Sequence, residues 1–479
     1  MAEVSFTSIL YMVQEYISQN YAAALSDRSK LGQLRAYIDK YLHDTGYTVE
    51  GLSTEELSEK LYTEMAEYSI LTPYLGKDSI EEININGWDD ICVTYNSGYM
   101  LKLSDHFFSP QHAVDIVKRL LHHSGMIIDN APPMAQGHLP GNTRITALKE
   151  PIVDPERGIS VSIRLLHPSR VTLDRIIRND TGTQQMIDFL CMCLRYGVSF
   201  VVAGATSSGK TTLLNALLTS VPNTKRIFTI ESGSRELSLV KLKEGRIVNN
   251  VVHTLSRPSD NPAYDITQEQ LVVASLRFNP DIVVVGEMRD TEAYSAVEAS
   301  LTGHTVVSTI HANAADAAHM RLALLCQKRF PINFQTSLMQ AGQAFPIVVY
   351  AHKLEDNSRK VMDISECVIL PNGDREYHTL FRYHITRNEV VGGKYHIEGR
   401  FEQPEYMSDN LKGKLMQFGV PEELLARFLK PKAAKKKAEP EKPAAKKAVD
   451  AKPTAKKPVA AKKPVAAKPD AKKKEVKRT

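Results

Sequence analysis

Residues 204–211 read Gly-Ala-Thr-Ser-Ser-Gly-Lys-Thr, and they stand between an apolar run that fits a buried strand and an apolar run that fits a helix. A loop of this composition lets successive backbone N–H groups surround a phosphate at the start of the helix. Lys210 then supplies positive charge to the outer phosphates, and the Thr211 hydroxyl can bind Mg²⁺. A chance glycine- and serine-rich turn is the alternative, but strand, loop and helix occur in the required order. The predicted nucleotide-binding residues are Gly204, Ala205, Thr206, Ser207, Ser208, Gly209, Lys210, Thr211 and Thr212.

Three further apolar runs suit buried strands of a parallel sheet, and each is followed by a residue able to act on a nucleotide. The runs are 226–230, 282–285 and 305–310, followed by Glu231, Glu287 and His311. If the strands are parallel, these residues and the phosphate loop share one edge of the sheet. Glu287 can then bind Mg²⁺ through water or polarise an attacking water, and His311 can sense the terminal phosphate. His304 lies seven residues before His311, at the other end of the same strand and about 23 Å away at ~3.3 Å per residue, so we expect a structural or subunit-contact role for it.

The charge of the chain is unevenly distributed. The net charge is +5, but residues 430–479 hold 19 basic and 5 acidic residues, which leaves the remainder mildly acidic. This tail repeats Ala, Lys and Pro without aromatic residues, so we expect it to be disordered. Its field would attract nucleic acid or anionic lipid, with lipid favoured, and a solubilising tail without a fixed partner is the alternative.

The five cysteines form neither a CxxC pair nor a zinc spacing, which favours reduced thiols in the cytosol. No apolar run approaches the roughly 18 residues that a membrane span needs. We therefore expect a cytoplasmic protein whose membrane association, if any, is peripheral.

The order of predicted elements divides the chain into five parts. Residues 1–72 look helical and include a capping box from Ser53 to Glu56, and residues 73–170 look like a smaller mixed α/β domain. Residues 171–400 alternate buried strands and helices, which indicates a parallel α/β sheet, with an antiparallel strand pair after residue 345. The last two parts are a small helical region, 401–429, and the tail, 430–479.

The segment RFNPDIVVVGEMRDTEAYSAVEASLTGHTVVSTIHAN, together with GATSSGKTT, resembles the type II/type IV secretion ATPase family over roughly residues 75–400. The likeness is strongest to its Tad-pilus (CpaF-like) and conjugative branch. It implies a homohexamer in which an N-terminal α/β domain and a RecA-like phosphate-loop NTPase domain enclose ATP. It also implies that Lys210 binds phosphate and that Thr211 binds the metal. Glu287 would be the catalytic acid of the second acidic motif and can also reach the metal, and His311 would be the residue of the family's histidine motif.

One element departs from the pattern of the family. Its acidic box usually reads Glu-Asp-x-x-Glu-Leu, whereas residues 231–237 read Glu-Ser-Gly-Ser-Arg-Glu-Leu. The Asp is missing and the second Glu comes one residue late. Glu231 and Glu236 therefore both remain candidates for positioning water, and slow turnover would not be surprising.

Arginines are expected at the site, because hydrolysis by phosphate-loop enzymes is accelerated by a guanidinium that neutralises developing charge. Arg144 and Arg164 stand on neighbouring strand-like segments and match positions where the family brings arginines onto the nucleotide. Arg257 and Arg277 fit family positions less closely. A surface salt bridge is the ordinary role for any single arginine.

The leading interpretation is a hexameric ATPase that docks on an inner-membrane platform protein and drives assembly of a type IV (Tad/Flp-like) pilus or type II/IV protein secretion. The alternatives are a nucleic-acid-translocating motor, a conjugative type IV secretion ATPase, and a nucleotide-gated scaffold that binds ATP without turnover.

Overall fold

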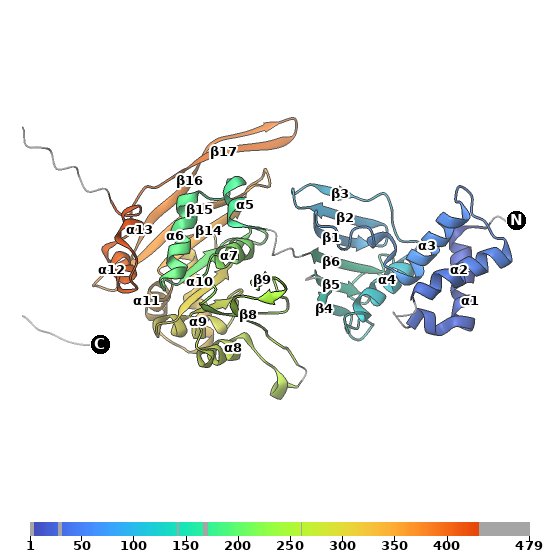
Figure 1. Ribbon diagram of the computed structural model, residues 1–479, viewed down its shortest axis with the longest axis horizontal. Coiled ribbons are helices and arrows are strands. Elements are labelled where there is room, and N and C mark those ends of the chain that lie inside the picture. Colours follow the sequence, from blue (N-terminus) through green and yellow to red (C-terminus); the bar gives the residue numbers. More distant parts are fainter. Residues whose placement is uncertain (1–3, 27–30, 141–142, 166–170, 260, 431–479) are drawn as a thin grey trace, which may run out of the picture. The chain divides into compact units, whose positions relative to one another are not determined.

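The computed structural model describes residues 4–26, 31–140, 143–165, 171–259 and 261–430 (Figure 1). The predicted basic tail, from residue 431 onward, lies outside the described residues. Within the described ranges, no helix combines the length and apolarity needed to cross a bilayer.

The N-terminal region is helical, as predicted. Helices α1 (Phe6–Ser26), α2 (Leu31–Thr45) and α3 (Thr54–Ala66) share one apolar core. The predicted capping box at the start of α3 is present, since Ser53 and Glu56 exchange side-chain and backbone hydrogen bonds. At the other end of α3, the guanidinium of Arg119 donates to the carbonyl oxygens of Glu64, Met65 and Glu67. Arg119 lies on α4 (Pro110–His122), so this contact ties the helical region to the next layer.

An antiparallel sheet of six strands follows, in the order β3-β2-β1-β6-β5-β4. Its strands are β1 (Ile80–Gly87), β2 (Asp90–Tyr95), β3 (Met100–Lys102), β4 (Met134–Leu139), β5 (Thr143–Lys149) and β6 (Ile159–Leu165). Helix α4 packs against one face of the sheet. Along β5 and β6, buried and half-buried residues alternate, and Arg144 and Arg164 are directly opposite each other on the face that does not enter this core.

The larger sheet has nine strands in the order β11-β8-β12-β13-β7-β14-β15-β16-β17. Its strands are β7 (Phe200–Ala203), β8 (Arg226–Glu231), β11 (Asn250–Leu255), β12 (Ile282–Val285), β13 (Thr305–Ile310), β14 (Ile347–Lys353), β15 (Arg359–Ile369), β16 (Arg375–Val391) and β17 (Lys394–Glu402). The first six in the spatial order are parallel. The four strands predicted from apolar runs, β7, β8, β12 and β13, are therefore parallel as expected.

Helices cover both faces of this sheet (Figure 1). Helices α5 (Leu173–Arg178), α6 (Gln184–Arg195), α7 (Lys210–Leu218), α12 (Asp409–Gln417) and α13 (Glu422–Ala426) enclose one apolar core, and α8 (Gln268–Ser275), α9 (Glu292–Leu301), α10 (Ala315–Arg329) and α11 (Phe334–Ala344) enclose the other. Alternate residues of β12 enter opposite cores, Ile282 and Val284 on one side, Val283 and Val285 on the other. This is the predicted RecA-like α/β core.

The edge of the large sheet formed by β14, β15, β16 and β17 is more extensive than the sequence predicted. The antiparallel pair predicted after residue 345 is present as β14 and β15, but β14 also pairs in parallel with β7, so the pair extends the main sheet. Strands β16 and β17 then continue the sheet as a long hairpin that the apolar pattern did not reveal, because most residues of its outer half are exposed. The predicted domain limits at residues 72, 170 and 400 remain predictions.

The central strand β7 offers a test of the core. Phe200 begins this strand and is 0% exposed, whereas Phe418 is 52% exposed. We expect Phe200→Ala to lower the free energy of unfolding by about 3–5 kcal/mol, because the change removes buried apolar surface and leaves a cavity. Phe418→Ala, the control, should cost about 1 kcal/mol or less. Urea unfolding of both variants checks this, and equal losses would contradict the assigned core.

Candidate nucleotide-binding site

The loop between β7 and α7 has a backbone that only certain residues can adopt. A side chain at Gly204 would collide with the carbonyl oxygen of Ala351 on β14. Gly209 caps the start of α7 with a φ of 88°, in the left-handed region that glycine tolerates best. The two glycines of the motif therefore stand where close packing and a positive φ require them.

Lys210, the first residue of α7, points back into this loop. Its Nζ donates to the carbonyl oxygens of Gly204, at 3.0 Å, and Ala205, at 2.9 Å. The side chain is buried, and this burial lowers its pKa. A partly desolvated positive charge at the start of a helix is a suitable setting for an anion, because the helix N-terminus also presents unpaired N–H groups.

The residues that follow β12 and β13 meet beside the loop. A Glu287 oxygen lies 2.8 Å from Nε2 of His311, and the other Glu287 oxygen accepts a hydrogen bond from Arg289. Burial lowers the pKa of His311, Lys210 and Arg289 lower it further, and Glu287 opposes them. Lys210, Glu287 and His311 line one cavity, whereas His304, before β13, is not among the described residues that line it.

The cavity has a volume of about 390 Å³ and is lined by residues from both sheets. Of the predicted nucleotide-binding residues, Gly204 and Ala205 do not line it. The predicted residues that do line it are Thr206, Ser207, Ser208, Gly209, Lys210, Thr211, Thr212, Arg144, Arg164, Glu236, Glu287 and His311.

The structure separates the two acids that the sequence left as alternatives. Glu231 ends β8, is 3% exposed and does not line the cavity. Its Oε1 accepts the backbone N–H groups of Glu236, at 2.7 Å, and Leu237, at 2.9 Å. Burial raises its pKa to about 7. Glu231 therefore closes the turn that carries Glu236, and the Glu236 side chain lines the cavity.

Of the four arginines considered from the sequence, two line the cavity and two do not. Arg144 and Arg164 line the cavity, and within the described ranges neither has an ion-pair partner. Arg257 forms an isolated bridge with Ile266, and Arg277 lies in a short 3₁₀ helix, and neither is among the described residues that line the cavity.

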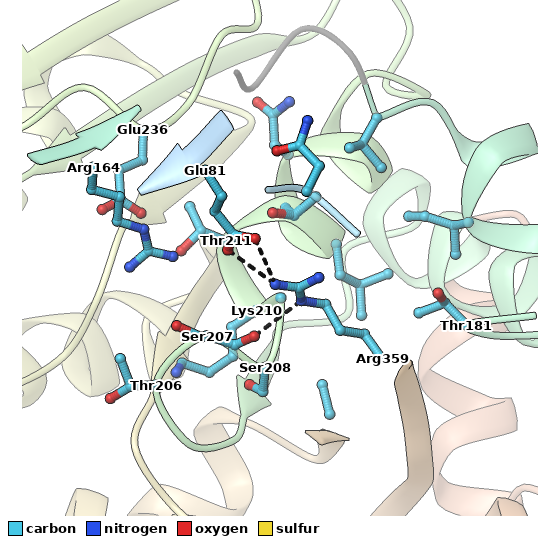
Figure 2. Close-up of a pocket in the computed structure, with 18 of the residues that line it drawn as sticks. Glu81, Arg164, Thr181, Thr206, Ser207, Ser208, Lys210, Thr211, Glu236 and Arg359 are labelled. Carbon is cyan, nitrogen blue, oxygen red and sulfur yellow. Dashed lines mark hydrogen bonds and ion pairs between the residues drawn. The ribbon is translucent and has the colours of Figure 1, made fainter. Parts of the chain in front are cut away.

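Four charged residues that line the cavity were not predicted: Glu81, Arg175, Arg289 and Arg359. Arg289, two residues after Glu287, could have been found from its place in the GEMRD segment. Glu81 on β1 and Arg359 on β15 form an ion pair across 278 positions of sequence, and no local pattern indicates it (Figure 2).

The oxygen atoms at the cavity fit Mg²⁺. The Thr211 hydroxyl and the carboxylates of Glu236 and Glu287 all line it, and hard oxygen ligands suit this ion. The described residues contain no cluster of three His, Cys, Asp or Glu side chains that could hold a metal alone. Mg²⁺ at nucleotide sites commonly takes one or two carboxylates with water and phosphate oxygens, so such a cluster is not needed.

Comparison with known proteins gives a family match. A family model described as type II/IV secretion system protein matches residues 64–365. An uncharacterized protein of Methanocaldococcus jannaschii, MJ0900, is 27% identical over 372 residues, covering 74% of this chain but only 63% of MJ0900. The type IV secretion system protein PtlH of Bordetella pertussis is 27% identical over 323 residues, covering 61% of this chain and 92% of PtlH. The crystal structure of the VirB11 ATPase from the Brucella suis type IV secretion system, in complex with sulphate, has 22% identity and a TM-score of 0.33, and the match covers 63% of this chain and 96% of VirB11.

Glu231 makes stability depend on pH. Its pKa rises from 4.5 in the unfolded chain to about 7 when folded, so its proton stabilises the fold fully below pH 4.5, and this stabilisation is lost as pH rises through 7. Relative to Glu231→Gln, the wild type should lose on the order of 3 kcal/mol between pH 4 and pH 8. Urea unfolding of both proteins across this range measures the difference. A constant difference would show that Glu231 titrates normally.

Proposed function

Because the chain belongs to the type II/IV secretion system protein family, we propose that it is a homohexameric ATPase that couples ATP hydrolysis to assembly of a type IV (Tad/Flp-like) pilus or to type II/IV protein secretion. The observation that carries this proposal is the meeting of Lys210, Glu287 and His311 in a cavity that also contains Arg144 and Arg164, for which the described residues provide no ion-pair partner. One triphosphate can contact all of these groups. The likeness to PtlH supports a secretion role.

Each part of the cavity has a distinct task in this proposal. The backbone N–H groups of the loop and the Lys210 ammonium bind the phosphates. Thr211 and Glu287 would hold Mg²⁺, the latter directly or through water, and the ion would neutralise phosphate charge. Arg144 and Arg164 neutralise the charge that develops on the terminal phosphate during hydrolysis.

The acids divide the work around the attacking water. Glu287 polarises the water, and His311 and Arg289 orient the Glu287 carboxylate by contacting its two oxygens. His311 also senses the terminal phosphate. Glu236 positions water or the metal from the other side, and Glu231 acts through it by fixing its backbone.

Mechanical work follows if Arg144 and Arg164 engage only when ATP is bound. Hydrolysis then removes the charge that holds them, and the six-stranded sheet can move. In the proposed setting the ring lies at the cytoplasmic face of the inner membrane and pushes on an integral platform protein. The basic tail would add contacts to anionic lipid or nucleic acid.

Purified protein tests the function directly. We expect hydrolysis of MgATP that a membrane-protein platform stimulates and DNA does not. Strong stimulation by DNA that persists after deletion of residues 430–479 would favour a nucleic-acid motor. ATP binding with no turnover under any condition would favour a nucleotide-gated scaffold.

Two substitutions separate binding from chemistry. Lys210→Ala should abolish tight nucleotide binding, because the main positive charge of the loop is lost. Glu287→Gln should retain binding and trap ATP, because the amide keeps the shape of the side chain but cannot polarise water. Binding of a fluorescent nucleotide and the rate of phosphate release measure the two effects. Normal turnover by Glu287→Gln would reject its assigned role.

Arg144 and Arg164 should act on turnover more than on binding. Arg144→Ala or Arg164→Ala should lower kcat at least about 100-fold, because each removes charge that stabilises the transition state. Arg157→Ala is the matched control, since Arg157 lies close to the same sheet but pairs with Asp89 at an exposed position. Steady-state hydrolysis of all three variants decides, and unchanged kcat in the first two would remove both residues from the mechanism.

A further inference from the structure

One side chain links the phosphate loop to the other sheet. Arg359 begins β15, directly after the turn that joins it to β14. Its Nε donates to the carbonyl oxygen of Ser207 at 3.0 Å, and one terminal nitrogen donates to both carboxylate oxygens of Glu81, at 3.0 and 3.1 Å (Figure 2). A single guanidinium therefore bonds the loop and strand β1 at once.

The bond to Ser207 controls the shape of the loop. Ser207 has a φ of 61°, which is uncommon for a residue other than glycine and must be held by its surroundings. The peptide group is planar and trans, so a carbonyl oxygen fixed on Arg359 turns the N–H of Ser208 to the opposite side. Inside the described protein that N–H has only a long contact, 3.4 Å, to the carbonyl oxygen of Ala205. It is thus well placed for a phosphate oxygen.

Arg359 itself is held firmly. Its neighbour Lys360 donates to the carbonyl oxygen and the carboxylate of Asp180, both at 2.7 Å, and the N–H of Val361 donates to Thr181. The Arg359 side chain also lies against Gly209, where an added Cβ would come within 3.2 Å of it. The start of β15 cannot shift without disturbing these contacts, so Arg359 provides a fixed anchor for whatever it bonds.

Glu81 connects this anchor to the arginines of the proposed mechanism. It lies on β1, and the next residue of this strand, Glu82, is opposite Arg164 in the antiparallel register of β1 and β6. Arg164 is in turn opposite Arg144 in the register of β6 and β5. Any force that holds Glu81 against Arg359 therefore also holds the strand that presents Arg164.

We propose that Arg359 is a positioning residue that couples the shape of the phosphate loop to the placement of Arg144 and Arg164, through its ion pair with Glu81. This inference rests on the proposed function. It assigns the contact through which the binding of phosphate in the loop affects the position of the six-stranded sheet. An ordinary exposed ion pair would have no such effect. The Arg157–Asp89 pair, in which both side chains are about half exposed, is such a pair and serves as the matched control.

The two bonds of Arg359 predict different kinetic effects. Arg359→Gln removes the loop anchor, so the Kd for a fluorescent ADP analogue should rise about tenfold. Glu81→Gln leaves the bond to Ser207 in place, so that Kd should change less than about twofold while kcat falls about tenfold, because only the arginines lose their placement. The kcat of the double variant should match that of Arg359→Gln alone, since both changes break one ion pair. Asp89→Asn should leave Kd and kcat unchanged.

The outcomes separate this inference from the proposed function. Wild-type kcat in Glu81→Gln, or losses of kcat that multiply in the double variant, would overturn the coupling while leaving the ATPase assignment intact. Thermal unfolding without nucleotide checks that each variant is folded, and Glu81→Gln is the safer of the two because the bond from Arg359 to Ser207 stays in place. Absence of nucleotide binding by the wild type would overturn the proposed function and the coupling together.

Discussion

The parallel register of β8, β12, β13 and β7 is the constraint on which the site depends. Both faces of these strands are buried under helices, so charged side chains find solvent only beyond the strand ends. Because the strands are parallel, their carboxyl ends lie at one edge, and the phosphate loop, Glu287 and His311 all follow those ends. The chemistry of the cavity is thus a consequence of how the core is covered.

Burial also explains why Glu231 and Glu236, which are close in the sequence, have different roles. Glu231 is the last residue of its strand and still lies within the protein, so it bonds the backbone of the following turn and has a raised pKa. Glu236, five residues later, lies on that turn and lines the cavity. The shifted acidic box keeps one acid for structure and one for the cavity.

The sequence predicted the parts that depend on local pattern. Apolar runs revealed the strands of the parallel core, and the strand-loop-helix order revealed the phosphate loop, because each depends on neighbouring residues. The hairpin of β16 and β17 was missed, since its outer half has no buried face to enforce alternation. The Glu81–Arg359 pair was missed for a different reason: it joins strands of two sheets, and only the folded chain brings them together.

The charge of the cavity gives a physical basis for coupling. Among the described residues that line it, six are lysine or arginine and three are glutamate. Part of this excess comes from Arg144 and Arg164 on the six-stranded sheet, and part from Lys210 at the start of α7 and Arg289 in the loop after β12. Like charges in a partly desolvated cavity repel more strongly than in water. An anion between the sheets would replace this repulsion with attraction, and loss of a phosphate would restore it. The Glu81–Arg359 pair is an attractive contact that opposes this repulsion at one point between the two sheets.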